Sequence, residues 1–191
     1  AGALAHSMNI PTFRLFLEVG FDRIDSLWNA MGFSFPLKNT PALALGTAEA
    51  SILETALAYS SFANGGYKIT PKSIVSITTA EGDILYLNDF SEVRNSVLSE
   101  RSVHLMRAML RKAVVEGTGA TMMSVYGVSV PFAGKTGTTQ NYADAWFAAF
   151  NPNLTIVARA GASSPLIHFD SGSNGTGSSL ALPLVALTLR K

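Results

Sequence analysis

The stretch from about residue 128 to residue 160 restricts the fold of this 191-residue chain more than any other part of it. Two apolar runs, Ala145–Phe150 and Leu154–Ala160, are separated by Asn151-Pro-Asn153, whose residue types favour a tight turn. This pattern predicts an antiparallel β-hairpin, and the segment Val128–Thr138 predicts a third strand before it. We therefore expect a small antiparallel sheet in the second half of the chain.

The rest of the chain is predicted to be mainly helical, because apolar residues recur at helical spacing between typical start and stop residues. Four helices are predicted. The first has Pro11 in its first turn, and the other three have Asp22, Thr47 and Ser99 as N-caps; they end near Gly20, Gly32, Ala63 and Val115, respectively. An apolar stripe on the third is expected to be buried: Ile52, Leu53, Ala56, Leu57 and Tyr59.

Two further elements complete the predicted order. Ile74–Thr78 and Ile84–Leu87 flank Glu81-Gly82-Asp83, which indicates a second hairpin. A Gly- and Ser-rich loop, Asp170–Ser179, leads into a final helix. Helices, then an antiparallel sheet and one closing helix, are typical of an α+β fold.

Composition excludes several classes of function. A net charge of +1 and 14% charged residues argue against nucleic-acid binding, since Arg107, Arg111 and Lys112 have the spacing of one solvated helix face. The chain has no cysteine, and its three histidines are scattered, so we expect neither a metal site nor a cofactor. The longest apolar segment, Leu180–Leu189, is too short to cross a bilayer, so no membrane contact is expected from it.

Lys135-Thr-Gly-Thr138 carries the strongest chemical signal. It places a cation, a glycine and two hydroxyls at what is predicted to be an exposed strand edge. A carboxylate-bearing substrate in an extended conformation suits such an edge, because Lys135 attracts the carboxylate and the backbone can bind the substrate as an added strand. Gly137 leaves room for close approach. The alternative is an ordinary strand-edge lysine without a function.

A longer pattern surrounds these residues. Gly134-Lys-Thr-Gly-Thr-Thr-Gln-Asn-Tyr-Ala-Asp-Ala-Trp-Phe147 resembles the corresponding stretch of the class A penicillin-binding proteins, the bifunctional peptidoglycan synthases. Ser7-Met-Asn9 is similar to their Ser-x-Asn motif, and Phe62–Gly66, Glu116–Gly119 and Gly177–Pro183 also match. The resemblance implies a β-lactamase/transpeptidase-like fold, here as a partial domain over residues 1–191, mainly helical in 1–66 and sheet-containing in 67–191.

The resemblance also implies a role for each matched residue. Lys135 would hold the electrostatics and assist proton transfer, while Thr136 and Thr138 would bind the carboxylate of a peptide or β-lactam. The Thr138 N–H would contribute to an oxyanion hole. Ser7 would relay a proton to the leaving amine, and Asn9 would hold the substrate's peptide group. For Ser7 and Asn9, a turn or helix-cap role is the alternative.

One motif of the family is missing from the chain. The nucleophile is a serine in Ser-x-x-Lys, and no lysine here has serine three places before it. We expect this nucleophile upstream of residue 1, so that the chain alone is inactive. The resemblance implies a D,D-transpeptidase that cross-links peptidoglycan stem peptides through an acyl-enzyme, in a parent anchored to the membrane and acting outside the cytoplasm. Whether a glycosyltransferase domain precedes it stays open.

Three other readings compete with a transpeptidase. A phosphate-binding loop is rejected because Ser129 stands where its first glycine is needed. A serine β-lactamase shares the lysine motif, but class A enzymes of this kind also need a deacylating glutamate, typically in Glu-x-x-Leu-Asn. The nearest match, Glu54-Thr-Ala-Leu57, lies in a predicted helix and is followed by Ala58 where asparagine is needed. A non-catalytic penicillin-recognising module, either sensor or structural, is the third alternative.

Overall fold

The α+β fold is confirmed in a computed structural model, which describes residues 1–89, 94–164 and 166–190. Strands β3 (Ala133–Thr138), β4 (Asp144–Asn151) and β5 (Leu154–Gly161) form an antiparallel sheet in the order β3-β4-β5. The predicted hairpin is therefore correct. The strand predicted from Val128 begins only at Ala133, because Val128 and Phe132 pack into the core instead.

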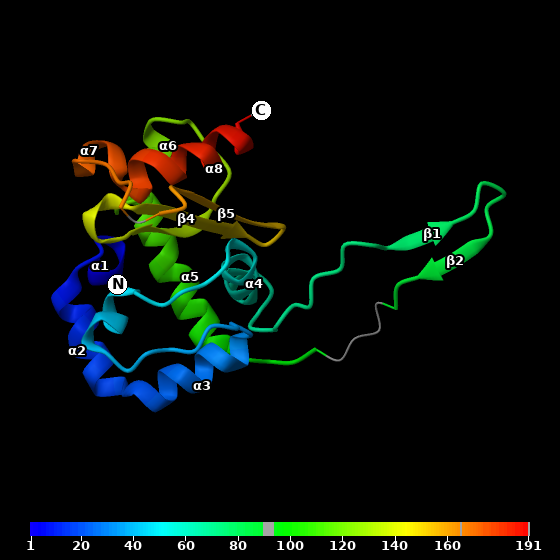
Figure 1. Ribbon diagram of the computed structural model, residues 1–191, viewed down its shortest axis with the longest axis horizontal. Coiled ribbons are helices and arrows are strands. Elements are labelled where there is room, and N and C mark those ends of the chain that lie inside the picture. The colour runs from blue at the N-terminus through cyan, green and yellow to red at the C-terminus, as the bar shows by residue number, and fades with distance from the viewer. Residues whose placement is uncertain (90–93, 165, 191) are drawn as a thin grey trace.

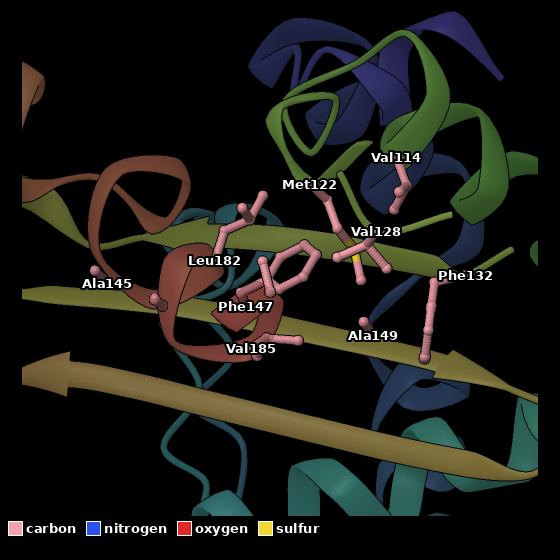
Figure 2. Close-up of a cluster of buried hydrophobic side chains, with 11 residues drawn as sticks. Val114, Met122, Val128, Phe132, Ala145, Phe147, Ala149, Leu182 and Val185 are labelled. Atoms are coloured by element: carbon pink, nitrogen blue, oxygen red, sulfur yellow. The ribbon is translucent and has the colours of Figure 1, made fainter. Parts of the chain in front are cut away.

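One face of this sheet carries the main hydrophobic core, shown in Figure 2. Helix α8 (Leu182–Leu189), the short helix α6 (Thr121–Ser124) and the end of α5 (Glu100–Val115) cover this face. Phe147 of β4 is completely buried among them, whereas Trp146 is half-buried, as alternation along the strand predicts. Burial of such a side chain contributes about 1.5–3 kcal/mol, so this core stabilises β4, the strand with which β3 pairs.

Helix α4 (Ile52–Ala63) packs against the opposite face. Its Tyr59 and Phe62 rings lie 6.2 Å and 6.1 Å from the ring of Phe150. Arg107 of α5 donates hydrogen bonds to the carbonyls of Phe62 and Ala63, at the end of α4 where carbonyls lack helical partners. Arg107 was expected on a solvated helix face, and this contact corrects that prediction.

Glycines end two of the N-terminal helices as predicted, but one predicted N-cap is wrong. Helix α1 (Gly2–Ala5) is followed by α2 (Asn9–Val19) and α3 (Phe21–Met31). Gly20 and Gly32 follow α2 and α3 with φ of 82° and 93°, a backbone region that favours glycine. Asp22 is not the N-cap of α3; it lies in the first turn, where a carboxylate complements the helix dipole.

Helix α4 begins later than predicted, at Ile52 rather than near Thr47. Ser51 accepts a hydrogen bond from the Glu54 N–H, and the Glu54 carboxylate accepts one from the Ser51 N–H, which forms a capping box. A 3₁₀ turn, η1 (Pro41–Leu45), precedes this start. The predicted buried stripe is wrong at its beginning, since Ile52 and Leu53 are 45% and 57% exposed.

The second predicted hairpin is present as β1 (Ser76–Thr78) and β2 (Ile84–Leu87). Figure 1 shows it as an arm that extends away from the other elements, and both strands are exposed on both faces. The glycine-rich segment is less of a loop than predicted, because it contains α7 (Gly172–Gly175) and a π-helical turn, η3 (Gly177–Ala181). Within the described ranges, no helix combines the length and the apolar character that crossing a membrane requires.

Replacing Ser51 by alanine should lower the free energy of unfolding by about 1 kcal/mol, because the Glu54 N–H then loses its partner. Thr47→Ala is the matched control, because Thr47 is exposed and lies outside α4, and it should change stability by less than about 0.5 kcal/mol. Urea unfolding monitored by circular dichroism measures both. A larger loss for Thr47→Ala would mean that α4 begins earlier.

Candidate active site

Lys135 lies in the middle of β3, on the strand that forms one edge of the sheet. Its Nζ donates a hydrogen bond to the Oγ of Ser7, 128 positions earlier in the chain, and a second to the carbonyl of Thr136 at 2.9 Å. The structure thus brings together the two predicted catalytic side chains. Sequence separation alone could not establish this contact.

Ser7 occupies the connection between α1 and α2. Its φ of 52° is in the left-handed region, which costs a residue other than glycine about 1 kcal/mol. This conformation follows the end of α1, where the Ser7 N–H binds the Leu4 carbonyl at 3.2 Å. The tight turn leaves the Ser7 side chain exposed beside β3.

Asn9 is the first residue of α2 and is exposed. It does not cap the helix: Met8 is the N-cap residue, and no side chain caps this end of α2. Within residues 1–89, 94–164 and 166–190, the structure records no hydrogen bond from the Asn9 amide. The amide group is therefore two residues from Ser7 and available to a ligand.

Burial lowers the pKa of the Lys135 ammonium below its ordinary value. The cause is desolvation, which disfavours the charged form of a lysine. A lysine with a lowered pKa can exchange a proton more readily near neutral pH than a fully solvated lysine can. The position of Lys135 therefore suits proton transfer as well as attraction of an anion.

The Thr138 hydroxyl lies at the end of β3 and is held by the glycine-rich segment. Its Oγ1 accepts a hydrogen bond of 3.0 Å from the Gly177 N–H. Gly137 pairs with Trp146, and a Cβ at position 137 would lie 3.2 Å from the Trp146 Cβ. Packing against Trp146 therefore gives glycine at 137 a structural reason, in addition to the predicted approach of a ligand.

The Thr136 hydroxyl contacts Thr118, which lies in the matched stretch Glu116–Gly119 but had no predicted role. Thr118, in the segment after α5, has its Oγ1 2.6 Å from the Thr136 Oγ1. The flanking glycines in Glu116-Gly-Thr-Gly119 were a usable signal, because paired glycines indicate close backbone contacts. Gly177 opens the matched stretch Gly177–Pro183, but its contact with Thr138 was not predicted.

Asp144 closes the connection between β3 and β4. Its N–H donates to the Thr139 Oγ1 at 2.8 Å, and its carbonyl accepts from the Thr139 N–H at 3.0 Å. Its carboxylate forms an ion pair with Arg159 of β5. These bonds fix the end of the Lys135 strand.

Glu54 is occupied in a structural role. Hydrogen bonds from Ser34 and Ser51 lower its pKa to about 2, so it remains a carboxylate with little basicity. It cannot serve as a deacylating base while it caps α4. Across the described residues, no three His, Cys, Asp or Glu side chains lie together as metal ligands.

The arrangement has two parts on one strand edge. Lys135 and Ser7 form a hydrogen-bonded cation–hydroxyl pair, and Thr136 and Thr138 add hydroxyls along the same strand. In the described part of the chain, no strand pairs with the edge of β3 that faces away from β4. Such an edge can bind an extended anionic ligand and move a proton near it.

A family model matches most of the chain. Residues 1–160 match the penicillin binding protein transpeptidase domain. Penicillin-binding protein 1A of Aquifex aeolicus is 36% identical over 182 residues, and that of Neisseria lactamica is 32% identical over 186 residues. The alignments cover 95% of this chain but only 24% and 23% of those relatives, so the chain spans about a quarter of their length.

Solved structures share the fold. Penicillin-binding protein 1A from Haemophilus influenzae superposes with a TM-score of 0.88 at 25% identity, covering 99% of this chain and 33% of that one. The PonA1 protein from Mycobacterium tuberculosis, solved in complex with penicillin V, gives a TM-score of 0.76 at 20% identity, covering 99% and 54%. The second likeness concerns the fold alone.

Replacing Lys135 by methionine should flatten the pH dependence of stability in alkaline solution. Because burial lowers the folded-state pKa below the ordinary 10.5, the unfolded chain binds more protons between these two values. The penalty for folding is present below the folded pKa and disappears as pH rises toward 10.5, so the wild type should gain stability relative to the variant over this window. Urea unfolding across this range tests it; parallel curves would contradict the expected burial effect.

Proposed function

Because this chain belongs to the penicillin-binding protein transpeptidase family, we propose that it supplies the proton-relay and carboxylate-binding part of a serine D,D-transpeptidase site. The observation that carries the proposal is the hydrogen bond from the Lys135 Nζ to the Ser7 Oγ. It joins two motifs that the sequence separates by 128 positions. An ordinary strand-edge lysine has no reason to meet this particular serine.

The direction of this hydrogen bond decides where the proton can go. A protonated lysine has only donors, so the Ser7 oxygen must be the acceptor. The hydrogen of the Ser7 hydroxyl is then free to point toward a bound substrate. Ser7 can donate this hydrogen to a leaving amine and recover one from Lys135, whose lowered pKa favours the transfer.

The substrate's carboxylate would bind along β3. Thr136 and Thr138 supply hydroxyl donors, and Lys135 supplies positive charge. The Thr138 N–H would act as one donor of an oxyanion hole, and Asn9 would bind the peptide group of the substrate. Removal of one oxyanion donor typically lowers turnover by about 10²–10³.

The reaction that fits this arrangement is acyl transfer from a D-Ala-D-Ala stem peptide. A serine hydroxyl passes its proton to a neighbouring base and attacks the carbonyl of the penultimate residue, and the C–N bond breaks to release D-alanine with a proton from Ser7. An amine of a neighbouring stem then attacks the ester and gives up a proton, and the serine is released with a proton on its oxygen. A β-lactam would acylate the same serine and remain bound.

The nucleophile is proposed to lie N-terminal to Ala1 in the full-length protein. This rests on the absence of Ser-x-x-Lys from the sequence and on the quarter of each relative that the chain spans. The chain by itself would then be inactive. We further propose that the full-length protein acts outside the cytoplasm, anchored to the membrane, with peptidoglycan stem peptides as substrates and further domains in the same polypeptide.

Incubation with benzylpenicillin tests the function directly. The protein is extended N-terminally by roughly half a domain, and its intact mass is recorded beside that of residues 1–191. We expect a stable one-drug adduct on a serine outside this chain and none on the chain alone. Hydrolysed drug with unchanged protein mass would instead indicate a β-lactamase. Unchanged drug and protein would indicate a non-catalytic module.

Lys135→Ala in the extended protein should slow acylation by at least about 10²-fold, on the scale of other electrostatic groups in active sites. Thermal unfolding should change little in comparison, because Lys135 lies at a sheet edge rather than in the hydrophobic core. Lys38→Ala, an exposed lysine outside the site, is the matched control. Loss of acylation in proportion to lost stability would assign Lys135 a structural role only.

A further inference from the structure

The segment after α5 contacts both halves of the candidate site. The Thr118 N–H donates a hydrogen bond of 3.0 Å to the carbonyl of Ala5, which is completely buried two residues before Ser7. The Thr118 hydroxyl lies 2.6 Å from the hydroxyl of Thr136, on the lysine strand. Thr118 therefore connects the turn that carries Ser7 with the strand that carries Lys135.

The backbone around Thr118 is tightly fixed. A side chain at Gly117 would overlap the Ala5 carbonyl, and the Gly119 N–H binds the Ala113 carbonyl at 2.9 Å. Thr118 is half-buried between these glycines. The backbone that carries the Thr118 hydroxyl is thus held in place by contacts that do not involve Thr136.

The contact between the Thr118 and Thr136 hydroxyls has one donor and one acceptor, and a bound ligand determines which is which. Each threonine hydroxyl has one hydrogen and can also accept. If Thr136 donates its only hydrogen to a ligand's carboxylate, the bond between the two hydroxyls must be donated by Thr118. Without Thr118, the Thr136 oxygen would lose its donor, and the Thr136 hydrogen would no longer be directed toward the ligand.

We propose that Thr118 is a positioning residue that orients the Thr136 hydroxyl toward the carboxylate of the ligand. The proposal rests on the function given above, in which Thr136 binds this carboxylate. It extends that function to a residue that does not touch the ligand. Because the contact is made both before and during reaction, its loss should weaken binding more than it slows chemistry.

The test compares Thr118→Val with the wild type in the full-length protein. Val keeps the shape but removes the hydroxyl, whereas Thr118→Ser keeps the hydroxyl. Thr121→Val is the matched control on the neighbouring helix α6, because the Thr121 hydroxyl is buried without a hydrogen-bond partner. Thermal unfolding of each variant is measured first, and Thr118→Ala replaces Thr118→Val if the latter does not fold.

The readout is acylation by benzylpenicillin and by its methyl ester. Each reaction is monitored through competition with a fluorescent penicillin. For the acid, we expect the dissociation constant before acylation to rise by roughly 3- to 10-fold in Thr118→Val, the size expected for one hydrogen bond. The acylation step should change less, Thr118→Ser should restore binding, and Thr121→Val should match the wild type. The ester lacks the anionic carboxylate, so its loss should be much smaller.

Other outcomes would overturn the proposal in distinguishable ways. Equal losses for acid and ester, or no loss for either, would show that Thr118 does not act through the carboxylate site. The same conclusion would follow if Thr118→Val weakened binding as much in a Thr136→Val background as in the wild type. If the wild type itself forms no adduct, the proposed function fails before Thr118 is tested.

Discussion

A single cation holds the candidate site together. Lys135 is partly removed from water, and an ammonium in such a place needs hydrogen-bond acceptors, which the Ser7 hydroxyl and the Thr136 carbonyl provide. These acceptors come from two parts of the chain that lie far apart in the sequence. The helical N-terminal residues and the sheet therefore meet at a polar contact, and the surrounding core has to hold both sides in register for that contact to exist.

The site is held in place by three kinds of interaction: the hydrophobic core, the pairing of strands and individual hydrogen bonds. The buried face of β4, centred on Phe147, fixes the sheet (Figure 2). Pairing of β3 with β4 then sets the register of Lys135 opposite Ala148 and of Thr136 opposite Phe147. Finally, the Thr118 hydroxyl contacts the Thr136 hydroxyl, and the Gly177 N–H binds the Thr138 hydroxyl at the end of the strand. The chemistry thus depends on hydrogen bonds whose geometry the apolar core makes available.

Much of this order could be predicted from local sequence. The Asn151-Pro-Asn153 turn, the glycines at positions 20 and 32 and the Ser99 cap are signals within a few residues, and the structure has elements ending or beginning at each. The lysine motif was informative for the same reason. A short run of residue types with special chemistry does not depend on what packs around it.

The sequence-based predictions were wrong or incomplete where a residue's role depends on partners far away in the sequence. Thr47 and Ser51 are both good cap residues. The helix begins after Ser51 because the Glu54 carboxylate binds Ser51 and Ser34. Helical periodicity places Ile52 and Leu53 on a common face, yet it cannot say whether another element covers that face. Thr118 was missed because its significance lies in a contact with Thr136, 18 positions away.

The backbone of Ser7 adds a consequence for how this chain can change. At φ of 52° glycine is the less strained residue, so selection for a robust fold alone would favour glycine there. Serine instead retains the strain together with a hydroxyl that Lys135, far along the chain, contacts. Position 7 is thus a place where the requirements of folding and of the proposed proton relay diverge, and the residue present is the one that the proposed relay requires.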